Sequence, residues 1–349
     1  MKKKLCYLTM LTCLMFIVSG CRMYADYTVN TDGTVTGTGF TAYTQAEIDQ
    51  LGEETKAQAT IQTLEDGNQY YVVPAETETV TLAEAEKSDG MRLTEDIFIY
   101  PIGSQAEAAG GNPADMGIYL QLSVSLLSDI VATNADVSYA GNKAVFSSNG
   151  TQTEGYWYAY TQKGKELVDA DTTAPKMKGA KNNKIYKEMP KNITFSDNIY
   201  VKEVKLNGKV VTATTATMED SEGNVTQQTI WASNGQDVSK QGKNTFKVTD
   251  IKGNTATYVI YLDSKVPTVK GIKNGKTYKK KAVFYVKDNR ELKSITINGK
   301  SQKMTKKKLV KSGKYKGYYK YTITKKGSHK IVVKDAAGNK KIIKIKIKK

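Results

Sequence analysis

The stretch DTTAPKMKGAKNNKIYK, residues 171–187, recurs as DSKVPTVKGIKNGKTYK at residues 263–279. Each copy opens on an Asp with a Pro four residues later, and each continues through Lys-x-Gly-x-Lys-Asn to a Tyr. Self-similarity at a fixed spacing indicates that one structural unit is used more than once. We therefore predict two consecutive domains in the C-terminal half, residues 171–262 and 263–349.

Short alternating strands joined by tight turns are predicted within each copy. Asn207-Gly208 and Asn298-Gly299 each lie between alternating apolar runs, and Asn-Gly is the strongest short signal for a hairpin turn. Residues 343–348 alternate Ile with Lys, which gives one apolar and one charged face of a strand. Many short strands of this kind are typical of an all-β sandwich.

Both copies close on Val-x-Asp-x-x-Gly-Asn, at residues 248–254 and 333–339. Together with the opening Asp-x-x-x-Pro, this motif resembles bacterial Ig-like domains found in tandem on surface proteins. The resemblance implies two Ig-like sandwiches over residues 171–349. It implies no particular ligand, because such domains serve as spacers, adhesins and carbohydrate binders alike.

The preceding residues, 21–165, predict an α+β domain that begins with a hairpin around Asp32-Gly33. Thr44 and Glu47 have the spacing of a capping box, so a helix is expected to begin there and to end at Gly52. A second helix is predicted over about residues 54–64, before Asp66-Gly67. Further strands are predicted at residues 69–73, 97–100, 119–127, 137–139 and 144–146.

This region resembles the LppM-type lipoprotein domain. The resemblance is carried by Cys21, by Asn-Thr-Asp-Gly-Thr at residues 30–34, and by the strand-turn-strand pattern that begins at Val-Ala-Thr-Asn, residues 131–134, and runs to Val145. Residues 80–113 show little of the family pattern. Members of that family have been thought to contact envelope lipids, so the resemblance implies a lipid-handling role.

The N-terminus has the three parts of an export signal, with Lys2 to Lys4 followed by an apolar run over residues 5–18. Val18, Ser19, Gly20 and Cys21 then resemble a bacterial lipobox. The resemblance implies removal of residues 1–20, a diacylglyceryl group on Cys21, and anchoring at the extracytoplasmic face of the cell membrane. An ordinary secretory signal with an incidental Cys21 is the alternative.

Charge divides the chain sharply. Residues 22–170 carry 7 Lys+Arg against 22 Asp+Glu, whereas residues 263–349 carry 29 against 4. A soluble, edge-protected sheet is the simplest explanation, but solubility rarely needs so much like charge, which costs self-repulsion. A polyanion partner, or neutralisation by the acidic half, explains it better. The candidate polyanion-binding residues are Lys279, Lys280, Lys281, Lys306, Lys307, Lys308, Lys344, Lys346 and Lys348.

The nature of the polyanion follows from residue type and location. Arg290 is the only arginine of residues 263–349, and export argues against nucleic acid. Lysine acts as a point charge that suits a dense, disordered polyanion. Anionic cell-wall polymers or lipid headgroups are therefore the expected partners, with no nucleic acid and with the oligomeric state left open.

Catalysis is not expected. One His and three Cys exclude most Cys/His metal clusters and most enzymes built on a catalytic His, and His329 precedes a predicted strand without a partner. Three tyrosines from Tyr156 to Tyr160 suit either a sugar- or lipid-binding face or, preferably, a half-buried strand that closes the domain. The adjacent carboxylates of the acidic half show no spacing that singles out an acid and a base; they are Glu53, Glu54, Glu65, Asp66, Glu84, Glu86, Glu95 and Asp96.

No metal site and no cofactor are predicted. Residues 218–224 are acidic but lack the alternating ligand positions of an EF-hand loop. Asp250 and Asp335 could touch a cation between domains, yet an Asp that begins a Gly-Asn turn is ordinary turn chemistry.

The sequence thus predicts a non-catalytic, membrane-anchored lipoprotein whose basic terminal domain contacts anionic envelope polymers. The alternative is lipid or glycolipid binding by residues 22–150, with the Ig-like repeats acting as a stalk.

Overall fold

The computed structural model describes residues 22–89, 91–102, 119–148, 155–191, 193–211, 213–219, 225–231 and 239–348. The predicted signal and lipobox, up to Cys21, therefore lie outside the described residues. The fold is multidomain and mostly β. Compact packing divides these described residues into two units: one lies within residues 22–179, 191–231 and 246–257, and the other within residues 180–190, 239–245 and 258–348.

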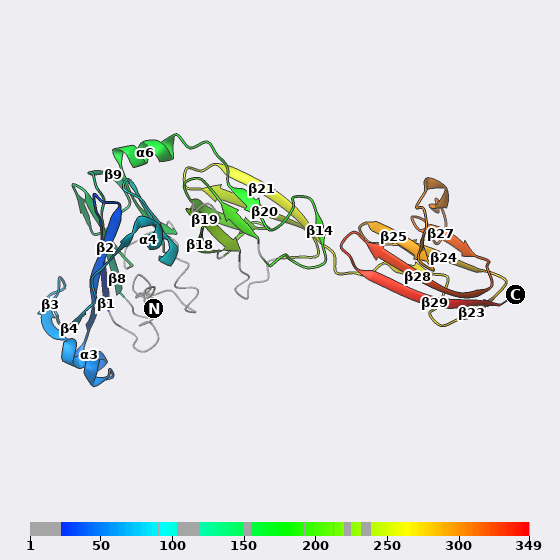
Figure 1. Ribbon diagram of the computed structural model, residues 1–349, viewed down its shortest axis with the longest axis horizontal. Helices are drawn as coiled ribbons and strands as arrows, with labels where there is room; N and C mark the ends of the chain where they lie inside the picture. The colour runs from blue at the N-terminus through cyan, green and yellow to red at the C-terminus, as the bar shows by residue number, and fades with distance from the viewer. Residues whose placement is uncertain are drawn as a thin grey trace. The chain divides into compact units, whose positions relative to one another are not determined.

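The N-terminal region contains two sheets (Figure 1). In the larger sheet, β1 pairs antiparallel with β2 across the predicted turn and parallel with β8 on its other side. The strands of this sheet are β1 (Arg22–Val29), β2 (Thr34–Tyr43), β3 (Thr60–Thr63), β4 (Gln69–Pro74), β5 (Glu78–Thr81), β8 (Tyr119–Ser125), β10 (Ser138–Ala140) and β11 (Lys143–Ser147). Those of the second sheet are β6 (Arg92–Leu93), β7 (Ile97–Pro101), β9 (Ile130–Thr133) and β12 (Tyr156–Thr161).

The first helices follow local chemistry, and one prediction was wrong. Helix α2 (Gln45–Ile48) begins at Thr44, whose backbone N–H donates to the Glu47 carboxylate at 2.7 Å. Helix α3 (Glu53–Gln58) is shorter than the helix predicted over residues 54–64. The residues after it form β3, because their β-branched side chains favour a strand and Asp66-Gly67 makes a hairpin turn that pairs β3 with β4.

Two helices were not predicted: α4 (Leu82–Asp89) and α6 (Gln162–Asp169). The hydroxyl of Thr161 accepts a hydrogen bond from the backbone N–H of Gly164 at 3.2 Å and so caps α6. None of the helices in the described part of the chain has the length and apolarity needed to cross a membrane.

Aromatic rings fill the described core of the N-terminal region. Trp157 is 1% exposed, and its ring centroid lies 5.9 Å from that of Tyr100 and 5.5 Å from that of Phe146. Phe146 in turn lies 5.7 Å from Phe98. Aromatic pairs at these distances add stabilisation beyond their buried area, so the two sheets are held by a continuous aromatic stack.

The first repeat is a two-sheet β structure. One sheet contains β13 (Lys176–Lys178), β15 (Thr194–Ser196), β18 (Ala213–Glu219) and β19 (Val225–Trp231). The other contains β14 (Ile185–Tyr186), β16 (Val201–Leu206), β17 (Lys209–Val210), β20 (Gly242–Asp250) and β21 (Thr255–Leu262). Asn207-Gly208 connects β16 and β17 with both residues at positive φ, as the Asn-Gly turn requires.

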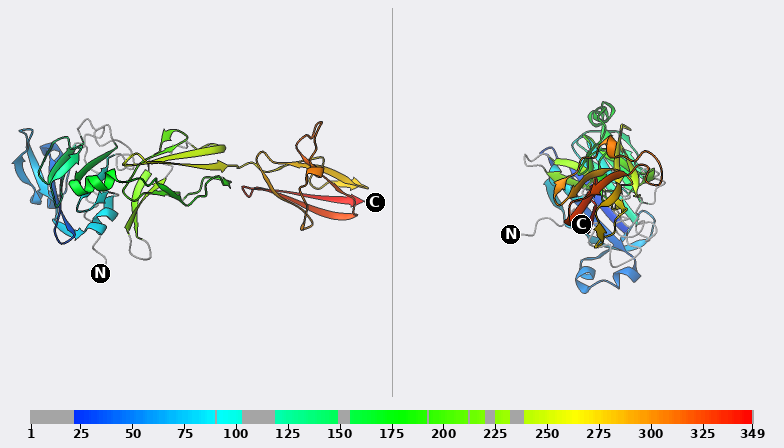
Figure 2. Two further views of the ribbon diagram at one scale, coloured as in Figure 1. Left: turned by 90° about the horizontal axis from the view of Figure 1, so that it is seen from above. Right: turned by 90° about the vertical axis from the view of Figure 1, so that its right-hand side faces the viewer.

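The second repeat also consists of two sheets (Figure 2). Its strands follow the order of the first repeat except that β18 has no counterpart, and the short helix η1 (Lys306–Lys308) stands in the loop before the sixth strand. Its smaller sheet contains β22 (Thr268–Lys270), β24 (Ala282–Lys287) and β27 (Tyr319–Ile323). Its larger sheet contains β23 (Thr277–Lys279), β25 (Leu292–Ile297), β26 (Lys300–Ser301), β28 (Gly327–Asp335) and β29 (Lys340–Lys348). The two sheets enclose an apolar core that includes Phe284, Ile295, Ile331 and Ile345.

Candidate polyanion surface and carboxylate clusters

A field of lysines covers the outward face of the larger sheet in the second repeat. Along β29, Ile343, Ile345 and Ile347 are buried while the lysines between them are exposed, as the alternation predicts. Neighbouring strands add further exposed lysines on the same face. We call these residues the lysine face: Lys279, Lys330, Lys334, Lys340, Lys344, Lys346 and Lys348.

Within the lysine face, like charges lie directly opposite one another. Lys330 pairs with Lys344, and Lys334 with Lys340, across β28 and β29. Lys279 pairs with Lys348 across β23 and β29. Such pairs destabilise a sheet, and among the described residues no lysine of 263–348 forms an ion pair with a carboxylate. The positive charge of this face is therefore available to an external anion.

The nine lysines singled out from the sequence separate into two groups. Lys279, Lys344, Lys346 and Lys348 lie on the lysine face, with Lys280 and Lys281 just beyond the end of β23. The other three form the short helix η1 (Lys306–Lys308) in the loop before β27, which belongs to the smaller sheet. Lys330, Lys334 and Lys340 were missed, although strand alternation around residues 330–340 could have found them.

Lys308 differs from its two neighbours, because its ammonium group lies 4.4 Å from the ring centroid of Tyr321. Tyr321 is buried, and burial raises the pKa of its hydroxyl to about 12. Lys308 is thus engaged in a cation–π contact, whereas Lys306 and Lys307 are exposed.

Several of the candidate carboxylates in the acidic half have partners close by in the structure. Glu53 pairs with Lys56 at 3.0 Å, and Glu84 accepts hydrogen bonds from Thr81 at the start of α4. Glu86 is buried against Arg92 at 3.1 Å, and burial raises the pKa of Glu86.

Asp66 and Asp96 also have local partners. Asp66 accepts hydrogen bonds from Tyr70 and the backbone N–H of Asn68 and pairs with Arg22 at 2.8 Å, which together hold the pKa of Asp66 at about 2. Asp96 pairs with Lys163, also at 2.8 Å. Both of these carboxylates are thus held by a basic side chain of the same region.

The tyrosines of β12 are largely buried, which confirms their interpretation as a domain-closing strand. Tyr156 and Tyr160 are buried together with Val168 of α6 and Tyr200 of the first repeat. Tyr158 stacks on Tyr160 with ring centroids 4.9 Å apart.

His329 lies within β28, not before it, and is buried. Its Nε2 lies 2.7 Å from the Lys325 carbonyl, to which it donates, and its Nδ1 lies 3.2 Å from the Asn298 amide. His329 therefore joins a turn to a strand.

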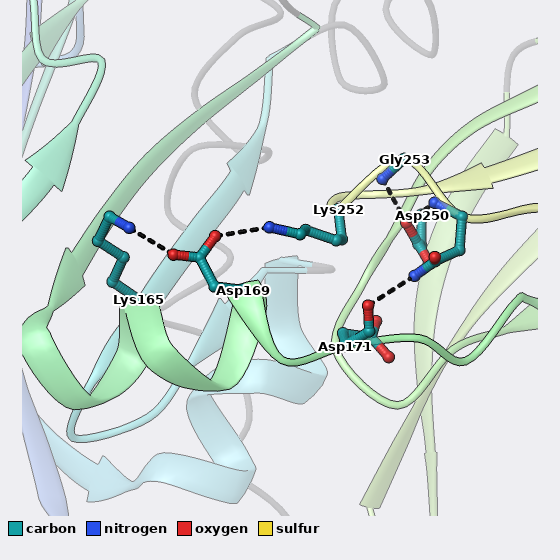
Figure 3. Close-up of polar contacts among 7 residues, drawn as sticks. Lys165, Asp169, Asp171, Asp250, Lys252 and Gly253 are labelled. Atoms are coloured by element: carbon teal, nitrogen blue, oxygen red, sulfur yellow. Dashed lines mark hydrogen bonds and ion pairs between the residues drawn. The ribbon is translucent and has the colours of Figure 1, made fainter.

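Three aspartates converge in the first repeat: Asp171, Asp197 and Asp250. Figure 3 shows Asp250 in the turn with Gly253, whose backbone N–H donates to Asp250 Oδ1 at 2.6 Å. This is the turn chemistry expected from the sequence. Asn254 of the same turn donates to the Asp171 carbonyl at 3.0 Å, so the start and the end of the repeat are joined here.

The second repeat brings together Asp263, Asp288 and Asp335 in the same way. Asn339 donates to the Asp263 carbonyl at 2.6 Å, as Asn254 does to Asp171 in the first repeat. Asp335 is fully buried and Asp263 is 1% exposed. These clusters were missed from the sequence, although the recurrence of all three aspartates at matching positions of both copies was a usable signal.

Residues 218–224 of the first repeat, considered for calcium from the sequence, fall largely outside the described residues.

Comparison with known proteins gives distant structural neighbours. No protein-family model matches the chain, and no curated protein matches it. The folded domain of Mycobacterium tuberculosis LppM is 13% identical, covers 44% of this chain and 97% of its own, and has a TM-score of 0.24. The N-terminal eight Ig domains of the Down syndrome cell adhesion molecule are 9% identical over 95% of this chain and 48% of that one, with a TM-score of 0.26.

A Bacteroides ovatus protein is a further neighbour: SGBP-B of the mixed-linkage glucan utilization locus, in complex with a mixed-linkage heptasaccharide. It is 14% identical over 60% of this chain, with a TM-score of 0.21, and this chain spans 50% of its length.

Proposed function

We propose that the protein is a non-catalytic binding protein whose lysine face contacts an anionic polymer of the cell envelope. The observation that carries the proposal is the pairing of Lys330 with Lys344 and of Lys279 with Lys348 at the same strand positions. These lysine pairs, which lack carboxylate partners, repel each other when no anion is bound. A polyanion laid across the strands would reverse the sign of that energy.

The proposal includes the location of the protein. A diacylglyceryl anchor on Cys21 would hold it at the extracytoplasmic face of the membrane, where anionic wall polymers and lipid headgroups are accessible. Two acyl chains give stable anchoring, since each buried CH₂ contributes about 0.8 kcal/mol. Intact mass of the mature N-terminus tests this part separately.

Residues 22–349, which contain every described element, should co-sediment with purified cell-wall sacculi that retain their anionic polymers. Replacing four residues of the lysine face, K330Q/K344Q/K346Q/K348Q, should weaken binding by on the order of a hundredfold or more. The reason is that each lysine near an anionic surface contributes about 1 kcal/mol. High salt should release the wild-type protein, because exposed charges are screened.

The matched control is K178Q/K181Q/K209Q/K247Q, which removes the same charge from exposed lysines of the first repeat. We expect it to bind within a few-fold of wild type. A second variant, K306Q/K307Q, tests the exposed lysines of η1. Equal loss of binding in the control and in the lysine-face variant would mean that binding depends only on the net charge of the protein, which would contradict the proposal. Binding to sacculi stripped of anionic polymer would also contradict it.

A further inference from the structure

The aspartate clusters of the two repeats combine burial with a lack of cationic partners. Asp263, Asp288 and Asp335 are three of the four acidic residues in a domain with 29 basic ones. Yet among the described residues no lysine or arginine forms an ion pair with any of them. Buried charges in proteins are paired or coordinate metals. With so many lysines nearby in sequence, the lack of a cationic side-chain partner among the described residues points to an external cation.

One oxygen of each carboxylate in the first repeat is held by protein donors. Asp171 Oδ1 accepts from the Thr173 backbone at 2.9 Å and from Asn198 at 3.0 Å. Asp197 Oδ1 accepts from the backbone N–H of Ile199 at 3.0 Å, and Asp250 Oδ1 from that of Gly253. These bonds fix the orientation of all three carboxylates.

The second oxygen of each of these carboxylates, Oδ2, is buried and has no hydrogen-bond partner. Asp250 is fully buried and Asp171 is 7% exposed, so these oxygens are not satisfied by bulk water. A buried acceptor without a partner is costly, and each such group requires an explanation. Three such unpartnered carboxylate oxygens in one cluster indicate a bound cation, which accepts their electron pairs.

The second repeat reproduces this arrangement with different neighbouring residues. Asp263 Oδ1 accepts from the backbone of Lys265 and from Asn289, while its Oδ2 is buried and unpartnered. Asp288 Oδ2 accepts from the backbone of Arg290, while its Oδ1 is likewise unpartnered. Asp335 Oδ2 accepts one hydrogen bond, from Asn339, and keeps a second lone pair.

The spacing of the oxygens matches a hard cation of calcium's size. In each cluster one oxygen per carboxylate lies within 4.8 Å of the others. Calcium binds oxygen ligands at about 2.3–2.6 Å, so two ligands on opposite sides of the ion lie roughly 5 Å apart. Magnesium requires shorter bonds and near-ideal octahedral geometry, and transition metals prefer nitrogen or sulfur ligands that these clusters lack.

We propose that each repeat binds one calcium ion, the first through Asp171, Asp197 and Asp250 and the second through Asp263, Asp288 and Asp335. The ion connects three positions that are far apart in sequence: the residue that opens the repeat, the residue that follows its third strand, and the closing turn. It thereby ties the beginning of each repeat to its end.

In the first repeat the site also lies beside the junction with α6. Asp169, the last residue of α6, pairs with Lys252 at 2.6 Å, and Lys252 belongs to the same turn as Asp250 (Figure 3). Calcium bound to Asp171 and Asp250 would fix the chain immediately after α6 to this turn.

Isothermal titration calorimetry of residues 22–349 with calcium chloride, after dialysis against EDTA and then buffer, tests the proposal. The titration should reach about 10 mM, because calcium sites of extracellular modules have Kd values of about 10⁻⁴–10⁻³ M. We expect two ions per chain, one for each cluster. D197N and D288N should each reduce the stoichiometry by one ion, and the double variant should bind none.

The matched controls are E188Q and E291Q, which neutralise an exposed carboxylate in each repeat and should keep both ions. Thermal unfolding gives a second measurement. In EDTA, D197N and D288N should be at least as stable as wild type, because they remove repulsion within the cluster. When calcium is added, the Tm of both repeats should rise in the wild type. In each variant, only the Tm of the repeat with an intact cluster should rise.

Three results would overturn the proposal. The first is the absence of both calcium-dependent heat and any change in wild-type Tm up to about 10 mM calcium. The second is equal calcium binding by E291Q and D288N, and the third is an increase in Tm on Asp→Asn substitution that is the same in EDTA and in calcium. The last result would identify the clusters as turn structures only. None of these measurements involves an anionic polymer, so they are independent of the proposed function.

Discussion

The two repeats differ on their surfaces and agree in their interiors. The first carries 13 basic against 9 acidic residues, and the second 29 against 4. Apart from β18, which has no counterpart in the second repeat, both nevertheless have the same strand order. Both also have the same Asn-Gly hairpin, a bulge at the same place in β16 and β25, and the same aspartate cluster.

The difference shows which positions specify the fold. Alternating apolar residues, turn glycines and buried aspartates recur in both repeats, so they are the features that the architecture requires. The solvent-facing residues of the strands carry mixed charge in the first repeat and form the lysine face in the second, and this difference does not change the topology. Binding properties of such a fold are therefore set by its outward residues.

Removing one core ring from each repeat should give the largest effect. Phe195 on β15 and Phe284 on β24 are both fully buried. F195A and F284A should each lower the free energy of unfolding of the repeat that carries it by about 3–5 kcal/mol, because Phe→Ala leaves a cavity. Urea denaturation combined with hydrogen exchange can follow each repeat separately.

F195L and F284L are the controls, with an expected loss below about 1.5 kcal/mol. A large effect of one ring and a negligible effect of the other would show that the interiors are not equivalent.

A glycine in the second repeat should have the next largest effect. Gly271 has φ +86°, and a Cβ at this position would lie 2.6 Å from the Val283 carbonyl oxygen. Gly299 has φ +79°, but a Cβ there meets no atom within 4 Å. G271A should cost about 2–3 kcal/mol and G299A about 1–2 kcal/mol, since both incur left-handed strain but only the first also clashes with backbone.

Gly179 holds the matching position in the first repeat, with φ +79°. G179A should therefore resemble G271A in denaturant titrations. A stabilising effect of either substitution would contradict the shared geometry.

The pH dependence of stability should reveal the aspartate cluster of the first repeat. Burial, reinforced by the charges of Asp171 and Asp250 and opposed by the backbone N–H of Ile199, raises the pKa of Asp197 to about 6. The folded state thus holds a proton between about pH 4 and pH 6 that the unfolded state has lost. That stabilisation is fully present below pH 4 and is lost as the pH rises through 6.

In EDTA, D197N keeps the neutral form at every pH. Its Tm should equal that of wild type near pH 4 and exceed it at pH 7, which differential scanning calorimetry can measure. Burial also raises the pKa of Asp288, so D288N should show the same direction. A Tm difference that does not vary between pH 4 and pH 7 would argue against a raised pKa.

The smallest effects are expected from single surface lysines, and they should differ in sign between the repeats. Lys205 pairs with Glu203 at 2.7 Å in the first repeat, whereas Lys330 faces Lys344 in the second. K205Q should lose up to about 0.5 kcal/mol of stability, while K330Q should gain a few tenths. High salt should reduce both differences. A loss of stability in K330Q would indicate a carboxylate partner for that lysine.

Most of the fold could be predicted from the sequence because its signals are local. Gly33 and the pair Asn298-Gly299 specify their hairpins through positive φ, and the alternation of Ile and Lys over residues 343–348 specifies which face is buried. Residues 60–63 were mistaken for a helix: their β-branched side chains favour a strand only weakly by themselves, and pairing with β4 decides the outcome. Pairing between strands is tertiary information that a local pattern does not contain.

The candidate sites show the same limit. The lysine face could be predicted in part, since alternation alone places Lys344, Lys346 and Lys348 on one side of a strand. The recurrence of the aspartates in both copies marked their positions, but it did not show that they converge, because Asp171 and Asp250 meet only through the register of the folded repeat. Their hydrogen bonds to neighbouring backbone also gave each Asp a sufficient local explanation.

The pairing of the second and last strands of each repeat has a mechanical consequence. β23 lies parallel to β29, and β14 lies parallel to β21, so tension on the two ends of a repeat pulls the paired strands in opposite directions along their length. The hydrogen bonds from Gly275 to Lys344 and from Lys280 to Lys348 would then be loaded in shear and would resist together. Both repeats are built to withstand stretching between their ends.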